Sequence, residues 1–431
     1  MPSPYAKTVR DPRLDFFRGI AMFIILLAHT PGNTWTRWIP ARWGFSDATE
    51  IFVFCSGMAS AIAFGKLFAT RGMAMGTVRI GYRVWQVYWA HIGLFFFVAM
   101  SMAAVNATGL FTERDYVGQL NLYPFFKNTE ANLIGLMTLT YVPNYFDILP
   151  MYLVILAMIP IVMGLARVHK GLVAVFVIGL WAAANVQVIA WAGGPEIQEL
   201  ELPAQLWFAE GQNTRPWFFN PFGWQLVFFT GFAFMLGWLP APPVRWWLIA
   251  VALVIVLWMV AYSNIGVREF GFSCRREEAL ICAREWRIEN RDLINKTNFG
   301  ILRYVHLLAI GYLAWVAVGP RGVVLSIGVW WPRLVAVIMK VGQQSLAIFI
   351  TSMALARFMG IVFDEIRAGV PRAERTWDWL HVSLVNLAGF AILIGVAYFV
   401  AWIKGQPWRG PKPEPRPQSN DAVPSGGAVR P

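Results

Sequence analysis

The chain has 431 residues, of which 57% are hydrophobic and only 14% are charged. Together with a mean hydropathy of +0.52, this composition excludes an ordinary soluble domain and predicts a protein with several membrane spans. The net charge of +12 does not indicate nucleic-acid binding, because the basic residues flank apolar runs and no aromatic-basic nucleic-acid motif is present.

Apolar runs of about 20 residues predict an all-α, polytopic membrane fold. The first run has no small-residue cleavage site, so we interpret it as an uncleaved first span. We expect about ten transmembrane helices, at 14–31, 47–66, 84–105, 147–166, 171–192, 222–239, 245–263, 299–319, 340–359 and 381–403. The shorter run 131–142 is expected to be re-entrant or interfacial.

Basic residues gather in alternate connections between these runs. Lys66, Arg71, Arg79 and Arg83 share one such connection, and the positive-inside rule then puts both termini in the cytoplasm. The expected organisation is a cytoplasmic segment 1–13, a membrane domain 14–404 with outer loops 106–146, 193–221, 264–298 and 360–380, and a disordered, proline-rich cytoplasmic tail 405–431.

The three cysteines give a limited signal. Cys274 and Cys282 share the loop 264–298 and can form a disulfide if that loop lies outside the cytoplasm. No cluster has the spacing of a metal site, so no metal is expected.

The first span carries two ionisable side chains, Arg18 and His29. Eleven residues make about three helical turns, so both lie on one face, about 16 Å apart along the axis. Such groups are costly in a membrane and are therefore functional suspects. The alternative is that Arg18 reaches the cytoplasmic surface and His29 makes a hydrogen bond inside the bundle.

Two acids, Asp47 and Glu50, open the next span at about the depth of His29. A carboxylate beside an imidazole stabilises the imidazolium, as a general base requires.

Further polar side chains lie inside or at the ends of the expected spans: His91, Asp147, Asn220, Gln225, Arg303, His306, Gln343, Gln344, Ser345 and Arg357. Each one alone is more often a contact within the bundle than a site. Together they indicate a polar cavity.

The order of Arg18-x10-His29 and Glu50-"IFVFCSG" resembles the paired motif of the acyltransferase-3 superfamily of membrane acyltransferases. More narrowly, "LDFFRGIAMFIILLAH", "FDILPMYL", "NPFGWQLVFFTGF", "LRYVHLLA" and "GQQSLAIF" resemble the OpgC family, the osmoregulated periplasmic glucan succinyltransferases. The resemblance covers about residues 11–404. The polar segment 264–298 matches no pattern of that family.

The resemblance implies a multi-pass enzyme of the bacterial inner membrane that moves an acyl group from cytoplasmic acyl-CoA to a hydroxyl of a periplasmic glucan. It implies succinyl as the acyl group, His29 as the catalytic histidine and Arg18 as its companion. The expected partners are acyl-CoA as co-substrate, the glucan and membrane lipids, with no nucleic acid and no permanently bound cofactor. The oligomeric state stays open.

On the donor side, we expect Arg18, Arg79 and Arg83 to bind the phosphates of acyl-CoA, because a guanidinium can bind phosphate through two hydrogen bonds. The alternative for Arg79 and Arg83 is that they act only as topology signals.

At the reaction centre, we expect His29 to deprotonate the sugar hydroxyl and Glu50 or Asp47 to orient it. Arg303 or Arg357 would hold the carboxylate of a succinyl group, which an acetyl group lacks. The alternative for both is a structural ion pair with Asp147 or Glu50. Direct transfer and an acyl-histidine intermediate both stay open. The remaining expected contacts with the acyl group or the acceptor are Asp147, Gln225, His306 and Ser345.

Two other readings use the same residues. A transporter or flippase would need them as a substrate or proton pathway, although no inverted repeat is visible in the sequence. Within the enzyme class, the alternative is acetyl transfer to another glycan of the cell envelope.

Overall fold

The computed structural model describes residues 11–110, 114–205, 215–275, 280–371 and 375–409. These residues form helices, irregular connections and two isolated β-bridges, Tyr141–Gln205 and Pro203–Pro216. The all-α prediction is therefore confirmed for the described part of the chain. The expected tail lies outside the described residues from 410 onward, as do residues 1–10 of the expected N-terminal segment.

The first half of the chain contains α1, the continuous helical run of α3, η2 and α4, and the helices α7 and α8. The elements in chain order are α1 (Pro12–His29), η1 (Thr34–Trp38), α2 (Pro40–Trp43), α3 (Ala48–Ser60), η2 (Ala61–Gly65), α4 (Lys66–Ala107), η3 (Gly118–Leu120), α5 (Tyr123–Lys127), α6 (Thr129–Met137), α7 (Ile148–Val168), α8 (Lys170–Ala183) and α9 (Val186–Trp191).

The second half of the chain adds further apolar helices. Its elements are α10 (Pro221–Met235), α11 (Trp246–Ala261), α12 (Asn264–Arg268), α13 (Ala283–Glu289), η4 (Arg291–Ile294), α14 (Ile301–Val318), η5 (Pro320–Ser326), α15 (Trp330–Gln343), α16 (Ser345–Ile366), α17 (Asp378–Lys404) and η7 (Pro407–Arg409).

Six helical runs in the described residues are long and apolar enough to cross a bilayer. The number is seven if η5 and α15, which meet at 118°, are counted as one broken span. The expected spans 14–31, 171–192 and 222–239 correspond to α1, to α8 with α9, and to α10. These helices are either short or, in α1, interrupted by charged residues. The structure supports a membrane protein, whereas the count of ten and the cytoplasmic termini stay predictions.

Two expected boundaries are wrong. The connection 66–83 is helical, because α3, η2 and α4 form one run that breaks only at Gly72, where φ is 80° and ψ is 179°. The expected span 340–359 crosses a helix end, since α15 stops at Gln343 and α16 runs from Ser345 to Ile366. Average hydropathy could not show this break, because apolar residues continue on both sides of one non-helical residue, Gln344.

Close helix contacts depend on glycine at two crossings. A Cβ on Gly57 of α3 would lie 1.9 Å from the carbonyl oxygen of Phe228 in α10. A Cβ on Gly19 of α1 would lie 2.1 Å from the carbonyl oxygen of Ile338 in α15. Both crossings therefore bring backbones together, as small residues allow between membrane helices.

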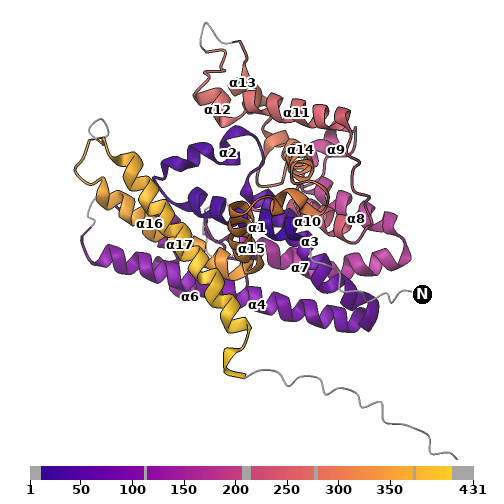
Figure 1. Ribbon diagram of the computed structural model, residues 1–431, viewed down its shortest axis with the longest axis horizontal. Helices are drawn as coiled ribbons and strands as arrows, with labels where there is room; N and C mark the ends of the chain where they lie inside the picture. Colours follow the sequence, from indigo (N-terminus) through magenta and orange to yellow (C-terminus); the bar gives the residue numbers. More distant parts are fainter. Residues whose placement is uncertain (1–10, 111–113, 206–214, 276–279, 372–374, 410–431) are drawn as a thin grey trace, which may run out of the picture.

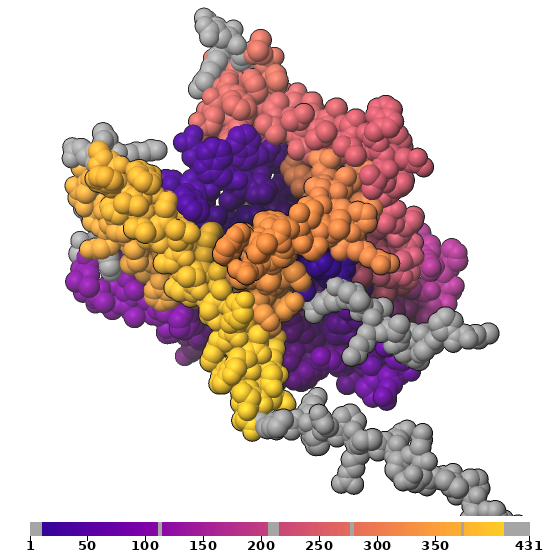
Figure 2. Space-filling view, viewed as in Figure 1, coloured from indigo at the N-terminus to yellow at the C-terminus, as the bar shows by residue number. Residues whose placement is uncertain are grey.

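Helix α1 is central to the arrangement. It packs against α3, α15 and α16, and its buried face includes Met22, Ile25 and Leu26. In Figure 1, α1 lies in the middle of the molecule, with α4 along one side and α17 running diagonally across the front. Figure 2 shows a hollow on this face, between the N-terminal segment that carries α2 and the C-terminal helices. Residues of the first part of the chain lie at its base.

The loop 264–298 contains α12, α13 and η4 rather than being irregular throughout. Cys274 and Cys282 form a disulfide in it, which the sequence allowed but did not establish.

Candidate active site

The His29 side chain lies at the last residue of α1 and is half-buried. Its Nδ1 lies 2.8 Å from the carbonyl oxygen of Ile25. A carbonyl can only accept, so Nδ1 carries the proton and donates it in this hydrogen bond. In the neutral ring Nε2 then holds the lone pair, and a nitrogen with a free lone pair can act as a general base.

Tyr145 contacts His29, and Arg357 contacts Tyr145 in turn. The rings of His29 and Tyr145 meet edge to face with centroids 5.6 Å apart. The guanidinium of Arg357, in α16, lies 5.6 Å from the same Tyr145 ring. Tyr145 itself is held by a 2.5 Å hydrogen bond from its hydroxyl to the carbonyl of Met353.

Arg357 is buried yet incompletely bonded. Its Nη2 donates to Gln119 Oε1 over 2.9 Å, but its Nε has no hydrogen-bond partner among the described residues. No carboxylate of the described residues forms an ion pair with it. A buried donor without a partner calls for an explanation such as a ligand.

The two acids at the start of α3 form a capping box. Asp47 Oδ1 accepts from the Thr49 amide over 2.7 Å, and Glu50 Oε2 accepts from the Asp47 amide over 2.8 Å. The sequence D-A-T-E has this signature, in which both acids serve the helix start.

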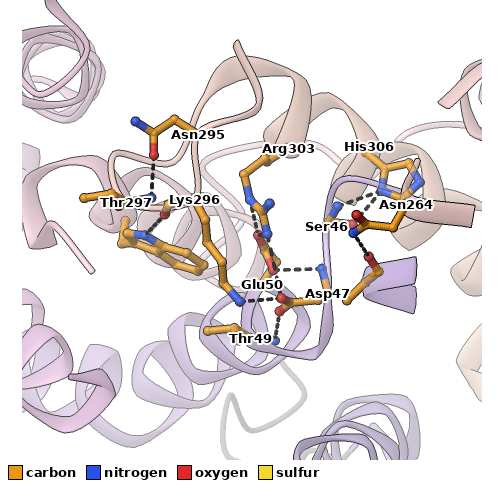
Figure 3. Close-up of polar contacts among 12 residues, drawn as sticks. Ser46, Asp47, Thr49, Glu50, Asn264, Asn295, Lys296, Thr297, Arg303 and His306 are labelled. Carbon is orange, nitrogen blue, oxygen red and sulfur yellow. Dashed lines mark hydrogen bonds and ion pairs between the residues drawn. The ribbon is translucent and has the colours of Figure 1, made fainter. Parts of the chain in front are cut away.

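Each acid also pairs with a cation (Figure 3). Glu50, which is fully buried, accepts from Arg303 Nε over 2.7 Å and pairs with Arg303 Nη2. Asp47 Oδ2 lies 2.5 Å from Lys296 Nζ and 3.8 Å from Arg303 Nη2. We expected Glu50 or Asp47 to orient His29. The described contacts of the two acids are instead with Arg303 in α14 and with Lys296 in the segment before that helix. The backbone carbonyl of Ile25 orients the His29 ring instead.

His306 has a structural contact. Its Nδ1 accepts from the Ser46 amide over 3.1 Å and lies 2.7 Å from the Ser46 hydroxyl. Figure 3 shows this pair beside the Glu50–Arg303 pair, where it ties α14 to the chain just before α3.

Arg18 is buried at the other end of α1, where it donates to the hydroxyl of Ser345 at the start of α16. Nearby, Gln343 donates to Asp15 over 3.3 Å. A groove of about 470 Å³ opens at this end of the molecule. Its lining includes Arg321, Lys340 and Gln343.

The other expected donor contacts lie on the surface of α4. Arg79 is exposed and stacks over Tyr82, with 5.3 Å from its Cζ to the ring centroid. Arg83 donates to Gln86 over 3.2 Å. The lining of the groove includes neither of them, nor Arg18 itself.

Three expected cavity residues are buried between helices. Gln225 donates to the carbonyls of Val177 and Phe222, which fixes α10 against α8. Asp147 precedes α7, and its Oδ1 has no partner among the described residues. Both ring nitrogens of the buried His91 likewise lack a described partner.

Sequence reasoning missed Lys296 and Tyr145. Lys296 lies in the polar segment that matched no pattern, but it is seven residues before Arg303 and shortly before an apolar run. Tyr145 lies two residues before Asp147, in a segment that was singled out for the acid alone. In the described part of the chain, no group of three or more His, Cys, Asp or Glu side chains could hold a metal ion.

Comparison with known proteins gives one match. No curated protein and no solved structure matches the chain significantly. The family described as OpgC protein matches residues 10–405, nearly the whole sequence. The chain therefore belongs to the OpgC family.

Proposed function

We propose that this protein transfers a succinyl group from succinyl-CoA to a hydroxyl of a glucan outside the cytoplasm, with His29 as the general base. Membership of the OpgC family supports a glucan-modifying acyltransferase in general. The observation that carries the finer proposal is the hydrogen bond from His29 Nδ1 to Ile25, because it leaves Nε2 as the basic nitrogen.

The reaction needs one proton transfer in each direction. The sugar hydroxyl gives its proton to His29 Nε2 while its oxygen attacks the thioester carbonyl. The C–S bond then breaks, the new ester C–O bond remains, and the imidazolium returns the proton to the leaving thiolate of CoA. No oxidant, reductant or metal is required for this exchange.

Arg357 supports succinyl as the acyl group. The acyl chain of succinyl ends in a carboxylate, and Arg357 is a buried guanidinium whose Nε has no described partner. Arg303, the other cation that we considered, is already paired with Glu50. We therefore assign the succinyl carboxylate to Arg357.

The groove beside Arg18 supports entry of the donor from the end of the molecule that we expect to face the cytoplasm. Its volume of about 470 Å³ falls within the ~300–1,000 Å³ of pockets that enclose small ligands. Arg321 and Lys340 would face the CoA phosphates there, and Arg18 would stand between the groove and His29. Arg79 and Arg83 on the surface of α4 would remain available for further phosphate contacts.

The expected location is the bacterial inner membrane. The apolar helices support a membrane protein, and the disulfide in the loop 264–298 suits an oxidising compartment outside the cytoplasm.

The test uses the full-length protein purified in detergent, with succinyl-CoA and glucan. We expect free CoA thiol to appear only when glucan is present, and the glucan mass to rise by one succinyl unit per transfer. Glucan that stays unmodified while the protein is folded would refute the proposal. Movement of glucan across vesicles without CoA release would favour a transporter instead.

A further inference from the structure

A polar pocket lies at the start of α14, whereas the groove described above is lined by η5, which follows the end of that helix. It has a volume of about 140 Å³, and its walls come from α9, from the segment around Glu199 and from η4 with the residues that follow it. The last two walls belong to the loops 193–221 and 264–298, which the charge pattern predicts to be outside.

Side chains that can donate hydrogen bonds and side chains that can accept them line this pocket. Gln187 and Asn295 supply amides, Glu199 and Asp292 supply carboxylates, and Trp191 supplies a ring. Amides both donate and accept, and carboxylates accept on two oxygens, so this set matches a ligand rich in hydroxyl groups. The exposed Trp191 ring offers an apolar face on which a sugar ring can stack.

The pocket is built rather than accidental. Asn185 and Asn298 are buried at its base, and Asn185 Nδ2 donates to the Asn298 carbonyl over 2.8 Å. The Asn298 side chain in turn donates to Glu199 Oε1, which fixes that carboxylate at the wall. Burial raises the pKa of Glu199, and the neighbouring charges of Glu201 and Asp292 act in the same direction.

One short segment connects the pocket to the reaction centre. Asn298 lines the pocket, and Lys296, two residues earlier, contacts Asp47 at the start of α3. Two residues of extended chain span at most about 7 Å. Helix α3, which Asp47 caps, packs against α1, which ends at His29. A polymer with one unit in the pocket could therefore extend neighbouring units toward His29.

We propose that this pocket binds one glucose unit of the acceptor glucan and so holds the polymer while another unit reacts at His29. The inference rests on the proposed function, because it takes a glucan as the acceptor. Its volume is below the ~300–1,000 Å³ of pockets that enclose a drug-sized ligand, which suits a single ring rather than an oligosaccharide.

The test compares the wild type with Trp191→Ala and Gln187→Ala. The matched control is Trp377→Ala, because Trp377 and Trp191 are each 61% exposed and Trp377 lies outside the pocket. The two exposed pocket side chains should be removable without loss of the fold. Glu199→Gln is a third variant, which keeps an oxygen to accept from Asn298.

Two readouts are used, the binding of a gluco-trisaccharide by calorimetry and the KM values for glucan and for succinyl-CoA. We expect Trp191→Ala to weaken trisaccharide binding and raise the glucan KM by about two- to tenfold. The KM for succinyl-CoA and the Trp377→Ala control should not change.

The outcomes separate this inference from the proposed function. If glucan is succinylated but its KM is the same in all three pocket variants, the pocket assignment is wrong and the proposed function stands. If the trisaccharide binds in a Trp191-dependent way but no acyl transfer occurs, the pocket assignment stands and the proposed function is wrong. Failure of the wild type to bind the trisaccharide, with no pocket effect on the KM, overturns the pocket assignment.

Discussion

The ionisable residues at the start of α3 and those around the end of α1 differ in how they are partnered. Glu50 and Arg303 are buried and bonded to each other, and Asp47 contacts Lys296 and caps its own helix. His29 and Arg357, by contrast, each use part of their bonding capacity on the protein and keep the rest.

This difference separates residues that hold the fold from residues that are free to act on a substrate. A buried charge that is fully paired has little left to offer a ligand, and removing its partner leaves it uncompensated. A half-buried base, or a buried guanidinium with an unused N–H, can take up a substrate without first breaking a contact. Sequence reasoning grouped His29 with Glu50 and Asp47, treated Arg303 and Arg357 as alternatives and missed Lys296, so it did not draw this distinction.

The largest effect is expected at His29. Replacement by alanine removes the base and should lower the turnover number by about 10²- to 10⁴-fold, while the thermal midpoint of the purified protein changes little. The measurement is CoA thiol release at saturating succinyl-CoA and glucan. His381→Ala is the control, because His381 is also half-buried but lies in the first turn of α17. Turnover near that of the wild type would remove His29 from the chemistry.

The second effect concerns stability at the paired cluster. Glu50→Ala should lower the free energy of unfolding by about 3–5 kcal/mol, because it leaves Arg303 buried without its carboxylate. The double change Glu50→Gln with Arg303→Met should lower the free energy of unfolding by less than Glu50→Ala alone or Arg303→Met alone. In the double variant, neither member of the buried pair carries a charge. Thermal unfolding in detergent measures both.

Arg291→Ala is the control for this experiment. Arg291 and Asp292 lie 3.7 Å apart, but their side chains are 82% and 43% exposed, so this pair should contribute about 0–1 kcal/mol. A double variant that is less stable than both single variants would mean that the cluster does more than neutralise charge.

The fold was predictable where apolar runs are uninterrupted. The expected span 147–166 matches α7, and the expected span 299–319 matches α14, within a few residues. The break at Gln344 and the helical connection 66–83 were not predictable, since hydropathy averages over a window and one residue ends a helix.

The candidate site was predictable in part. The spacing of Arg18 and His29 identified α1, but distances within a helix say nothing about partners on other helices. Arg303 pairs with Glu50 across 253 residues of sequence. The sequence offered this pair only as one alternative, because no local pattern contains the contact. The capping box of Asp47 and Glu50 was visible in the sequence, and it would have indicated a structural role for these acids.

The third effect tests whether Arg357, whose Nε has no hydrogen-bond partner among the described residues, binds the succinyl carboxylate. Arg357→Gln should raise the KM for succinyl-CoA by about 10- to 100-fold, because a hydrogen bond to a charged group contributes about 1.5–3 kcal/mol. Transfer from acetyl-CoA, which has no terminal carboxylate, should fall much less. Rates with both donors give the ratio directly.

Arg367→Gln provides the matched control for that ratio. Arg367 follows the same helix, but Asp378 already pairs with it over 2.6 Å, so its loss should leave the preference between donors unchanged. Equal losses with succinyl-CoA and acetyl-CoA in Arg357→Gln would mean that Arg357 does not contact the carboxylate.

The smallest effect on stability is expected at Lys296, which lies at the solvent-exposed edge of the cluster formed by Asp47, Glu50 and Arg303. Lys296→Met should lower the free energy of unfolding by no more than about 1 kcal/mol, because the Lys296 side chain is 30% exposed and water screens such pairs. Asp47 would keep its cap on Thr49 and the Arg303 guanidinium 3.8 Å away. Thermal unfolding beside Glu50→Ala gives the comparison. A loss of unfolding free energy as large as that of Glu50→Ala would mean that Lys296 belongs to the buried cluster. The group of fully paired charges would then include Lys296 and extend closer to His29.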